Sequence, residues 1–312
     1  MKAVKDIDLN RIKNARDLIK AFDESGGFQA KHVAIGYEIL KEMIHDKECV
    51  KFMSFTANLI STGFRGVVRE LVKRKLVDII ITTNGTLDHD IARTYKDYYH
   101  GFFELDDKEL KHEGIHRLGN VLVPEDSYGV IIEEKVQEWL KKIYDAGIRE
   151  ISGHELIWKF GEFINDENSI LYWAWKNKIP IIVPGFFDGA VGYQIWQFWQ
   201  DGHKDFKVNL LLDEQLLSDT VWNTKRTGAL IIGGGVSKHH TIWWNQFKNG
   251  LDYAVYITTA IEEDGSLSGA KTREAISWNK ISERGRHITI FGDATIILPI
   301  IAKALIEDLD EG

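Results

Sequence analysis

The sequence predicts an α/β protein with one doubly wound, mostly parallel sheet and helices on both of its faces. Short apolar runs typical of buried strands alternate with longer stretches whose apolar residues recur at helical spacing. Small polar or glycine-rich turns follow most of the runs, as at the ligand-binding edge of a parallel sheet. The expected strands are residues 51–56, 77–81, 121–123, 178–184, 206–212, 229–232, 253–257 and 287–291.

The first 30 residues are predicted to form a helical arm that precedes a single catalytic domain, residues 31–312. Apolar residues from Leu9 to Phe22 have helical spacing, and the stretch 25–30 then breaks the helix. From its residues alone, the arm is expected to pack on its own domain. No internal repeat or linker divides the rest of the chain.

Between the strands, several apolar stripes predict helices that cover the sheet. The stretch from His154 to Trp175 is expected to be largely helical, and another helix is expected to run through Val221. The remaining stripes lie in residues 33–44, 64–72 and 132–143, the last ending at Gly147.

Composition and charge narrow the function. The 312 residues carry a formal charge of −8, which disfavours nucleic-acid binding and suits a cationic partner. Cys49 is the only cysteine, so neither an internal disulfide nor a cysteine-based metal site is expected. We find neither a signal-peptide pattern nor an apolar run long enough to span a membrane, and we expect a cytoplasmic protein.

The most informative stretch begins where the apolar run 229–232 meets three consecutive glycines, residues 233–235. Glycine lets backbone N–H groups approach an anion, and a following helix directs its positive end toward that anion. No Gly-x-Gly-x-x-Gly fingerprint is present, so the turn permits a dinucleotide site without identifying one. The alternative to a dinucleotide site is an ordinary strand–turn–helix unit that binds no ligand.

Lys280 is the candidate nucleophile. It follows Trp278 and Glu274, and a lysine near an indole and carboxylates can act as a desolvated amine of the Schiff-base kind. The alternative is a surface lysine after a strand–helix unit.

Four segments of this part of the chain closely resemble the deoxyhypusine synthase family. They are GGGVSKHH (233–240), DYAVYITTA (252–260), DGSLSGA (264–270) and EAISWNK (274–280). The likeness extends from about residue 8 to residue 305. It implies a Rossmann-like catalytic domain of the deoxyhypusine synthase type and a homotetramer, a dimer of dimers. It also implies that the N-terminal arm plugs the entrance of a neighbouring subunit's site, and the sequence leaves this placement and packing on its own domain both open.

The resemblance also implies NAD as the cofactor. Loops at the carboxyl ends of the strands match the family's nucleotide-contacting segments, although any strand–helix protein has such turns. For Asp188, capping of the next helix is the alternative to a ribose contact. The implied cofactor-binding residues are Asn58, Ser61, Thr83, Gly85, Asp188, Gly233, Gly234, Gly235, Thr259, Ala260, Asp264, Asp293 and Ala294.

The implied reaction transfers the 4-aminobutyl group of spermidine to a lysine of the translation factor 5A precursor. Lys280 carries the group as an enzyme imine, which requires a neutral amine and therefore burial beside Trp278. His239 is the candidate base. Glu274 and Asp264 would hold the cationic ends of the polyamine. The implied substrate-binding residues are Asp88, His89, Tyr193, His239, Trp243, Gly265, Ser268, Glu274 and Trp278.

The sequence departs from the better-known eukaryotic members at the amine end. Tyr193 and Leu267 stand where those members have carboxylates, Trp243 replaces an amide, and His89 replaces a glutamate. These changes leave the polyamine open, with agmatine as another possible donor and cation–π contacts as one substitute for charge. Two further interpretations are a homospermidine-synthase-like enzyme with a small amine acceptor and an inactive NAD-binding regulator.

Overall fold

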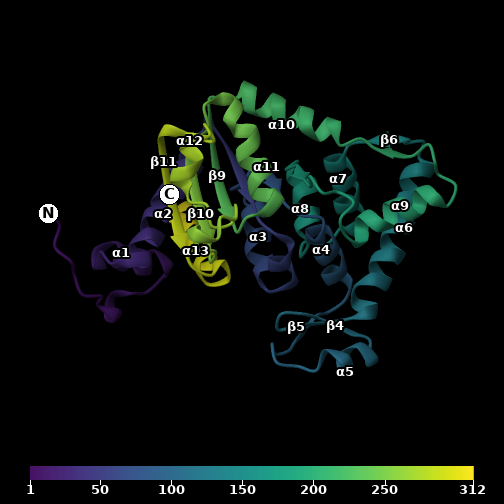
Figure 1. Ribbon diagram of the computed structural model, residues 1–312, viewed down its shortest axis with the longest axis horizontal. Helices are drawn as coiled ribbons and strands as arrows, with labels where there is room; N and C mark the ends of the chain where they lie inside the picture. The colour runs from purple at the N-terminus through teal and green to yellow at the C-terminus, as the bar shows by residue number, and fades with distance from the viewer. Residues whose placement is uncertain (312) are drawn as a thin grey trace. The chain divides into compact units, whose positions relative to one another are not determined.

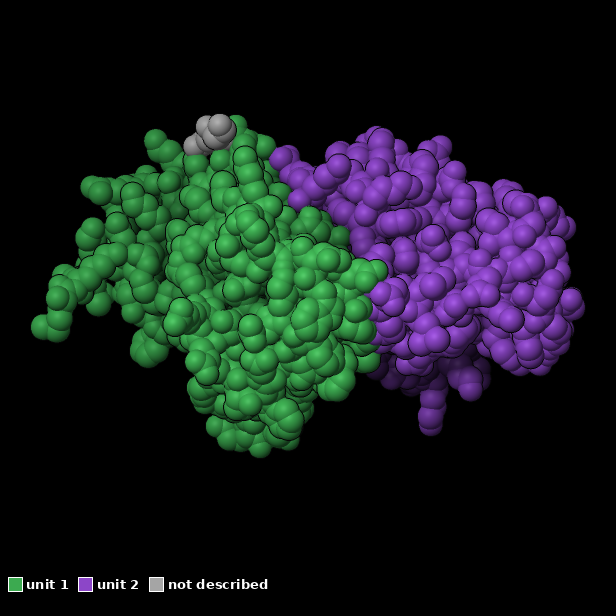
Figure 2. Space-filling view, turned by 90° about the horizontal axis from the view of Figure 1, so that it is seen from above, with its two compact units in different colours: residues 1–55, 76–79, 217–312 green, residues 56–75, 80–216 purple. Residues whose placement is uncertain are grey.

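The computed structural model describes residues 1–311, and the chain divides into two compact units (Figure 2). Unit 1 comprises Met1–Phe55, Leu76–Ile79 and the chain from Leu217 onward, and unit 2 comprises Thr56–Lys75 and Ile80–Leu216. The arm boundary at residue 30 and the single domain after it stay predictions. Among residues 1–311, no helix has both the length and the apolar character of a membrane span.

Unit 1 is built on parallel strands that lie side by side in the order β11, β10, β9, β1. Strands β9 and β10 are largely buried, and all four strands pair in parallel, with one register shift between β10 and β11. This pairing satisfies their backbone hydrogen bonds within the sheet. The strands are β1 (Cys49–Ser54), β9 (Arg226–Ile232), β10 (Leu251–Thr258) and β11 (Ile281–Phe291).

Helices cover both faces of these strands. The side chain of Val255 lies toward Gly36 of α2, whereas the neighbouring Tyr256 lies beneath Lys238 of α11, and successive strand residues point to opposite faces. On the α2 side, α1 packs against α2 and α13 (Figure 1). The helices are α1 (Ala15–Ser25), α2 (Phe28–His45), α11 (Gly235–Asn245), α12 (Thr272–Ser277) and α13 (Ala294–Glu311), with 3-10 turns η1 (Leu9–Arg11), η4 (Gln246–Lys248) and η5 (Glu262–Asp264).

Unit 2 is mainly helical. Its helices pack pairwise, α7 on α8, α6 on α9 and α3 on α8, around apolar side chains such as Trp139 and Phe160. The helices are α3 (Phe64–Lys73), α4 (Gly85–Tyr95), α5 (Asp107–His112), α6 (Gly129–Asp145), α7 (Gly153–Ile164), α8 (Ile170–Asn177) and α9 (Ala190–Gln200), with 3-10 turns η2 (Ala57–Ser61) and η3 (Glu125–Ser127).

Short strands complete unit 2. Strands β2 and β7 pair in parallel, as do β6 and β8, whereas β3, β5 and β4 form a small antiparallel sheet. Strand β2 and helix α10 run from one unit into the other. The bounds are β2 (Ile79–Ile81), β3 (Tyr99–His100), β4 (Ile115–Leu118), β5 (Val121–Pro124), β6 (Glu150–Ile151), β7 (Ile181–Ile182), β8 (Lys207–Val208) and α10 (Leu211–Asn223).

The predicted α/β class, with parallel strands flanked by helices, is confirmed. The strand predicted over 206–212 is wrong beyond Val208, because the Asn209 side chain accepts from the Leu211 N–H and α10 begins there. The helix predicted from His154 to Trp175 is two helices, since α7 ends at Asn165 in the left-handed conformation. The expected strand 121–123 exists as β5, although its pairing is antiparallel.

Candidate active site

The glycine turn (residues 233–235) connects β9 to α11 in unit 1. Gly233 and Gly235 have φ values of 73° and 64°, which favour glycine. No side chain caps the first turn of α11, and a side chain at Gly235 would meet nothing within 4 Å. The turn therefore fits the predicted anion site, because the first N–H groups of a helix require external acceptors.

Gly234 has a different role from its neighbours. A Cβ atom at this position would lie 2.1 Å from the Ser268 Oγ and 2.5 Å from its Cα. The Thr258 hydroxyl also donates to the Ser268 carbonyl at 2.9 Å. The loop 264–270 thus packs directly on the glycine turn, and Gly234 is required for that contact as well as for any ligand.

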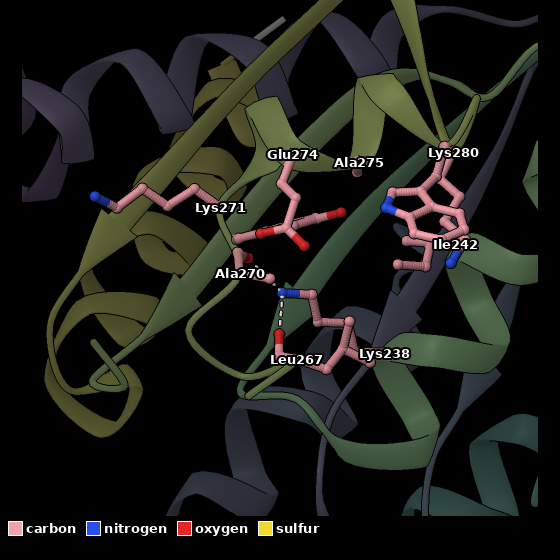
Figure 3. Close-up of a pocket in the computed structure, with 10 residues that line it drawn as sticks. Lys238, Ile242, Leu267, Ala270, Lys271, Glu274, Ala275 and Lys280 are labelled. Carbon is pink, nitrogen blue, oxygen red and sulfur yellow. Dashed lines mark hydrogen bonds between the residues drawn. The ribbon is translucent and has the colours of Figure 1, made fainter. Parts of the chain in front are cut away.

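A cavity of about 190 Å³ in unit 1 brings several predicted residues together (Figure 3). Glu274, Trp278 and Lys280 line it. The Lys280 Nζ lies 5.3 Å from the centroid of the Trp278 ring. Lys280 is half-buried and Trp278 is 63% exposed, so the expected burial of this pair is incomplete within the chain.

His239 lies on the exposed side of α11, where its ring stacks on Trp243 with centroids 5.7 Å apart. Partial burial lowers the pKa of His239, and the positive charge of Lys280 lowers it further. The imidazole is therefore neutral near pH 7. A neutral imidazole can accept a proton, as the predicted role requires.

The remaining cofactor candidates of unit 1 follow β10 and β11. The Asp293 carboxylate accepts from the Thr295 N–H and hydroxyl, each at 2.8 Å, at the start of α13, where Ala294 is buried. The Asp264 carboxylate accepts from the Ser266 N–H at 2.6 Å. The Ser266 side chain, and after it this N–H, lowers the pKa of Asp264. Thr259 and Gly265 are exposed, and the Ala260 N–H donates to the Thr258 hydroxyl.

In unit 2, the predicted cofactor residues after β1 and β2 meet one another. The Thr83 hydroxyl accepts from the Ala57 N–H at 3.1 Å, and a Cβ at Gly85 would lie 3.0 Å from the Ala57 Cβ. Ser61 is buried and donates to the Asn58 carbonyl at 2.7 Å, while Asn58 itself is exposed. The structure thus joins two turns that were predicted separately.

Asp88, a predicted substrate-binding residue, is buried and stabilises α9. Its carboxylate accepts from the Tyr128 hydroxyl at 2.8 Å and from the Ala190 and Val191 N–H groups at 3.0 and 2.8 Å. Burial raises the pKa of Asp88, and these hydrogen bonds oppose the rise. A contact with substrate stays a prediction for Asp88, whose carboxylate has few acceptor positions left.

Asp188 does not provide the cap that was its alternative role. Helix α9 has no side-chain bond from its N-cap residue Gly189, and the contacts to its first N–H groups come from Asp88. Asp188 is exposed, as is Tyr193, whose ring lies 5.4 Å from that of Trp196.

His89 is buried between aromatic rings in unit 2. Its Nδ1 lies 3.0 Å from the Tyr98 hydroxyl, and its ring is 5.6 Å from that of Tyr128. Burial lowers the pKa of His89 to about 4. The ring is therefore neutral at pH 7.

Sequence reasoning missed Lys238. Its side chain is 1% exposed, and its Nζ donates to the carbonyls of Leu267 and Ala270 in the wall of the same cavity. One signal was available: Lys238 stands four residues before Ile242, on the apolar stripe of the helix that became α11.

These features define an α/β protein with an uncapped glycine turn and, in the same unit, a cavity lined by lysine side chains and a carboxylate. The deoxyhypusine synthase family model matches residues 17–305, and the chain belongs to this family of transferases. A probable deoxyhypusine synthase of Picrophilus torridus is 58% identical over 304 residues, 97% of each chain. One of Thermoplasma acidophilum is 55% identical over 298 residues, 96% of this chain and 95% of the relative.

The fold agrees with a solved structure. A crystal structure of a candidate deoxyhypusine synthase from Entamoeba histolytica matches with a TM-score of 0.67 over 97% of both chains. At 22% sequence identity, this likeness concerns the fold alone.

Proposed function

We propose that the chain catalyses the NAD-dependent transfer of the 4-aminobutyl group of spermidine to one lysine of the translation factor 5A precursor. The observation that carries the proposal is Lys280: the family's Ser-Trp-x-Lys motif (277–280) is present, and its lysine lines a cavity together with Glu274. The proposal includes a cytoplasmic homotetramer, which the family resemblance suggests.

The residues suit the cofactor and the chemistry it supplies. NAD, when bound, accepts a hydride from the carbon beside the secondary amine of spermidine and later returns it. Residues 233–235 would hold its pyrophosphate, since the first turn of α11 has no side-chain cap and Gly235 faces open space. The other contacts proposed from the sequence lie on the loops, 3-10 turns and helix starts that follow strands in each unit.

Lys280 would perform the group transfer. Its neutral Nζ adds to the imine carbon of the oxidised amine, and the carbon–nitrogen bond to the departing 1,3-diaminopropane breaks. The butylamine group is then held as an imine on Lys280. The ε-amine of the acceptor lysine adds to the same carbon and releases Lys280, and reduction of the new imine completes the product.

His239 and Glu274 would assist these steps. His239 accepts a proton from an attacking amine, because its imidazole is neutral near pH 7. Glu274 is exposed at the cavity and can accept hydrogen bonds from a terminal ammonium group, each contributing roughly 1.5–3 kcal/mol. Trp278 offers a ring face to the same cation.

The direct test is to incubate the chain with NAD, labelled spermidine and the 5A precursor, followed by mass spectrometry of the precursor. We expect one aminobutyl addition on one lysine. Labelling that requires no NAD would contradict the proposal, as would the absence of labelling.

A small-amine acceptor is the second candidate function. The departures at Tyr193, Trp243, Leu267 and His89 favour it, because they change the predicted amine contacts. Parallel assays with putrescine as acceptor and with agmatine as donor separate the candidates: homospermidine formation without modification of the 5A precursor would support the second.

A further inference from the structure

We propose that Lys238 is a positioning residue of this active site, which connects α11 to the loop 264–270 and thereby orients the residues that bind cofactor and amine. The inference rests on the proposed function for what the loop binds. Its structural part concerns contacts within unit 1 alone.

The ammonium group of Lys238 is almost completely enclosed. Its Nζ donates to the Leu267 carbonyl at 2.6 Å and to the Ala270 carbonyl at 2.7 Å, as the dashed lines in Figure 3 indicate. It also lies 4.3 Å from the centroid of the Tyr256 ring. Two carbonyls and one ring face thus receive the three donors of the ammonium group.

These contacts hold the loop on both sides of Ser268. Ser268 itself is contacted by the Thr258 hydroxyl, which donates to its carbonyl, and by Gly234, which lies close to its side chain. Asp264 and Gly265 are exposed at the start of the same loop. Lys238 therefore links α11, which begins at the glycine turn, to loop residues that flank Ser268, a residue that the proposal assigns to substrate binding.

Because the Lys238 ammonium group is buried, it depends on its two carbonyl partners for stability. A buried ammonium is destabilising unless it is fully hydrogen-bonded, so the loop carbonyls must stay in place while Lys238 is charged. Burial lowers the pKa of Lys238 to about 8, and the negative charge of Glu274 opposes that shift. Figure 3 shows the Glu274 carboxylate directed toward the Lys238 amine. Lys238 therefore also affects the charge environment of the carboxylate proposed to bind the amine.

The test compares Lys238→Met, which keeps the length and removes the donors, with Lys141→Met. Lys141 is an exposed lysine of unit 2 that pairs with Asp145 at 2.7 Å. Hydrogen exchange measured by mass spectrometry on the ligand-free protein reports the mobility of the loop 264–270. Steady-state kinetics with spermidine and NAD report KM and kcat separately.

We expect Lys238→Met to speed amide exchange in the loop 264–270 by roughly tenfold, the change that loss of a charged hydrogen bond can produce. Exchange in β9 and β10 should stay at the wild-type rate. The KM for spermidine should rise by roughly tenfold with a smaller change in kcat, since binding geometry is lost and Lys280 is retained. Lys141→Met should change neither measurement.

Three results would overturn the positioning role: unchanged loop exchange in a folded Lys238→Met variant, faster exchange throughout unit 1, or a loss confined to kcat. Lys238→Gln, which keeps amide donors, is the second variant if the methionine variant does not fold. Unfolding of both would assign Lys238 to the stability of the whole unit instead. Because the exchange experiment needs no substrate, failure of the proposed transfer reaction would leave its result standing.

Discussion

Helices α11 and α9 each follow a parallel strand and a glycine-containing turn. They differ in whether a side chain of the protein accepts hydrogen bonds from their first N–H groups. At α9, the buried carboxylate of Asp88 accepts from the Ala190 and Val191 N–H groups. At α11, no side chain caps the first turn and Gly235 faces open space. The first N–H groups of α9 are therefore hydrogen-bonded within the protein, whereas those of α11 can bind a ligand.

The same contrast extends to the ionisable side chains around each helix. Near α9, Asp88, His89 and Asp90 are buried and hydrogen-bonded. Near α11, His239 and Glu274 are exposed and Lys280 is half-buried. Groups of the first kind mainly stabilise the fold, whereas groups of the second kind can meet a substrate. Four predictions test this division, beginning with the largest effect.

Lys280→Ala should lower aminobutyl transfer by roughly 10³-fold or more, as expected for removal of a covalent nucleophile. NAD affinity and thermal stability should stay close to wild type, because Lys280 is half-buried and at the edge of a cavity. Borohydride trapping with spermidine and NAD should add a butylamine group to Lys280 in the wild type. Full transfer by the alanine variant would remove Lys280 from the mechanism.

Asp90→Ala, in unit 2, should lower the stability of the protein, in contrast to Lys280→Ala, which should lower its activity. The Asp90 carboxylate accepts from the Arg65 Nε at 2.6 Å and from the Ser169 hydroxyl and the Ile170 and Leu171 N–H groups at the start of α8. Removing it leaves the buried guanidinium of Arg65 without a carboxylate partner, although its hydrogen bonds to the Asp90 carbonyl and the Thr94 hydroxyl are retained. The expected cost is about 3–5 kcal/mol. Denaturant unfolding measures the loss.

The matched comparison for Asp90→Ala is Glu274→Ala in unit 1. Glu274 is exposed, so its removal should lower the free energy of unfolding far less than Asp90→Ala does, although it also removes a favourable charge near Lys238. The KM for the amine should rise by roughly tenfold, the equivalent of about 1.4 kcal/mol. Equal stability of the two variants would contradict the division between structural and functional carboxylates.

His89 should make the stability of the chain depend on pH. Its folded pKa of about 4 lies below the ordinary 6.5, so the unfolded chain binds more protons between these pH values. Stability from this group is complete above pH 6.5 and is lost as pH falls toward 4, by about 3 kcal/mol. Denaturant unfolding of His89→Gln at pH 7 and pH 5 should show a smaller difference than the wild type. His239→Gln should reduce this difference less than His89→Gln does, because the His239 ring is exposed and only partial burial and the charge of Lys280 lower its pKa. An equal effect of both variants would contradict the assignment.

The sequence predicted β9 and β10 well because each contains a continuous apolar run, whereas it missed the polar first half of β11, residues 281–286. Residues 229–232 and 253–257 lie within β9 and β10. It failed at residues 209–212, where Leu211 and Leu212 continue an apolar run but are exposed on α10. Apolar character alone could not distinguish these leucines from strand residues.

The site was predictable only in part. The motifs identified Lys280, Glu274 and the glycine turn because those residues are close in sequence. The role of Asp88 depends on N–H groups about a hundred residues away, and the role of Lys238 depends on two loop carbonyls. Such partners have no signature in a single sequence, since a backbone group is the same at every position.

The smallest predicted effect concerns the open start of α11. Gly234→Val is a poor test of cofactor binding, because the new side chain would collide with Ser268 whether or not NAD is present. Gly235→Asn is cleaner: asparagine tolerates the left-handed conformation, and the position faces open space. We expect NAD affinity to fall by more than about tenfold, or about 1.4 kcal/mol.

Gly147→Asn, at an open positive-φ glycine after α6, is the control and should leave NAD affinity unchanged. Calorimetric titration with NAD distinguishes a pyrophosphate-binding turn from an ordinary connection between a strand and a helix. Wild-type affinity in a folded Gly235→Asn variant would mean that the uncapped start of α11 does not bind the pyrophosphate.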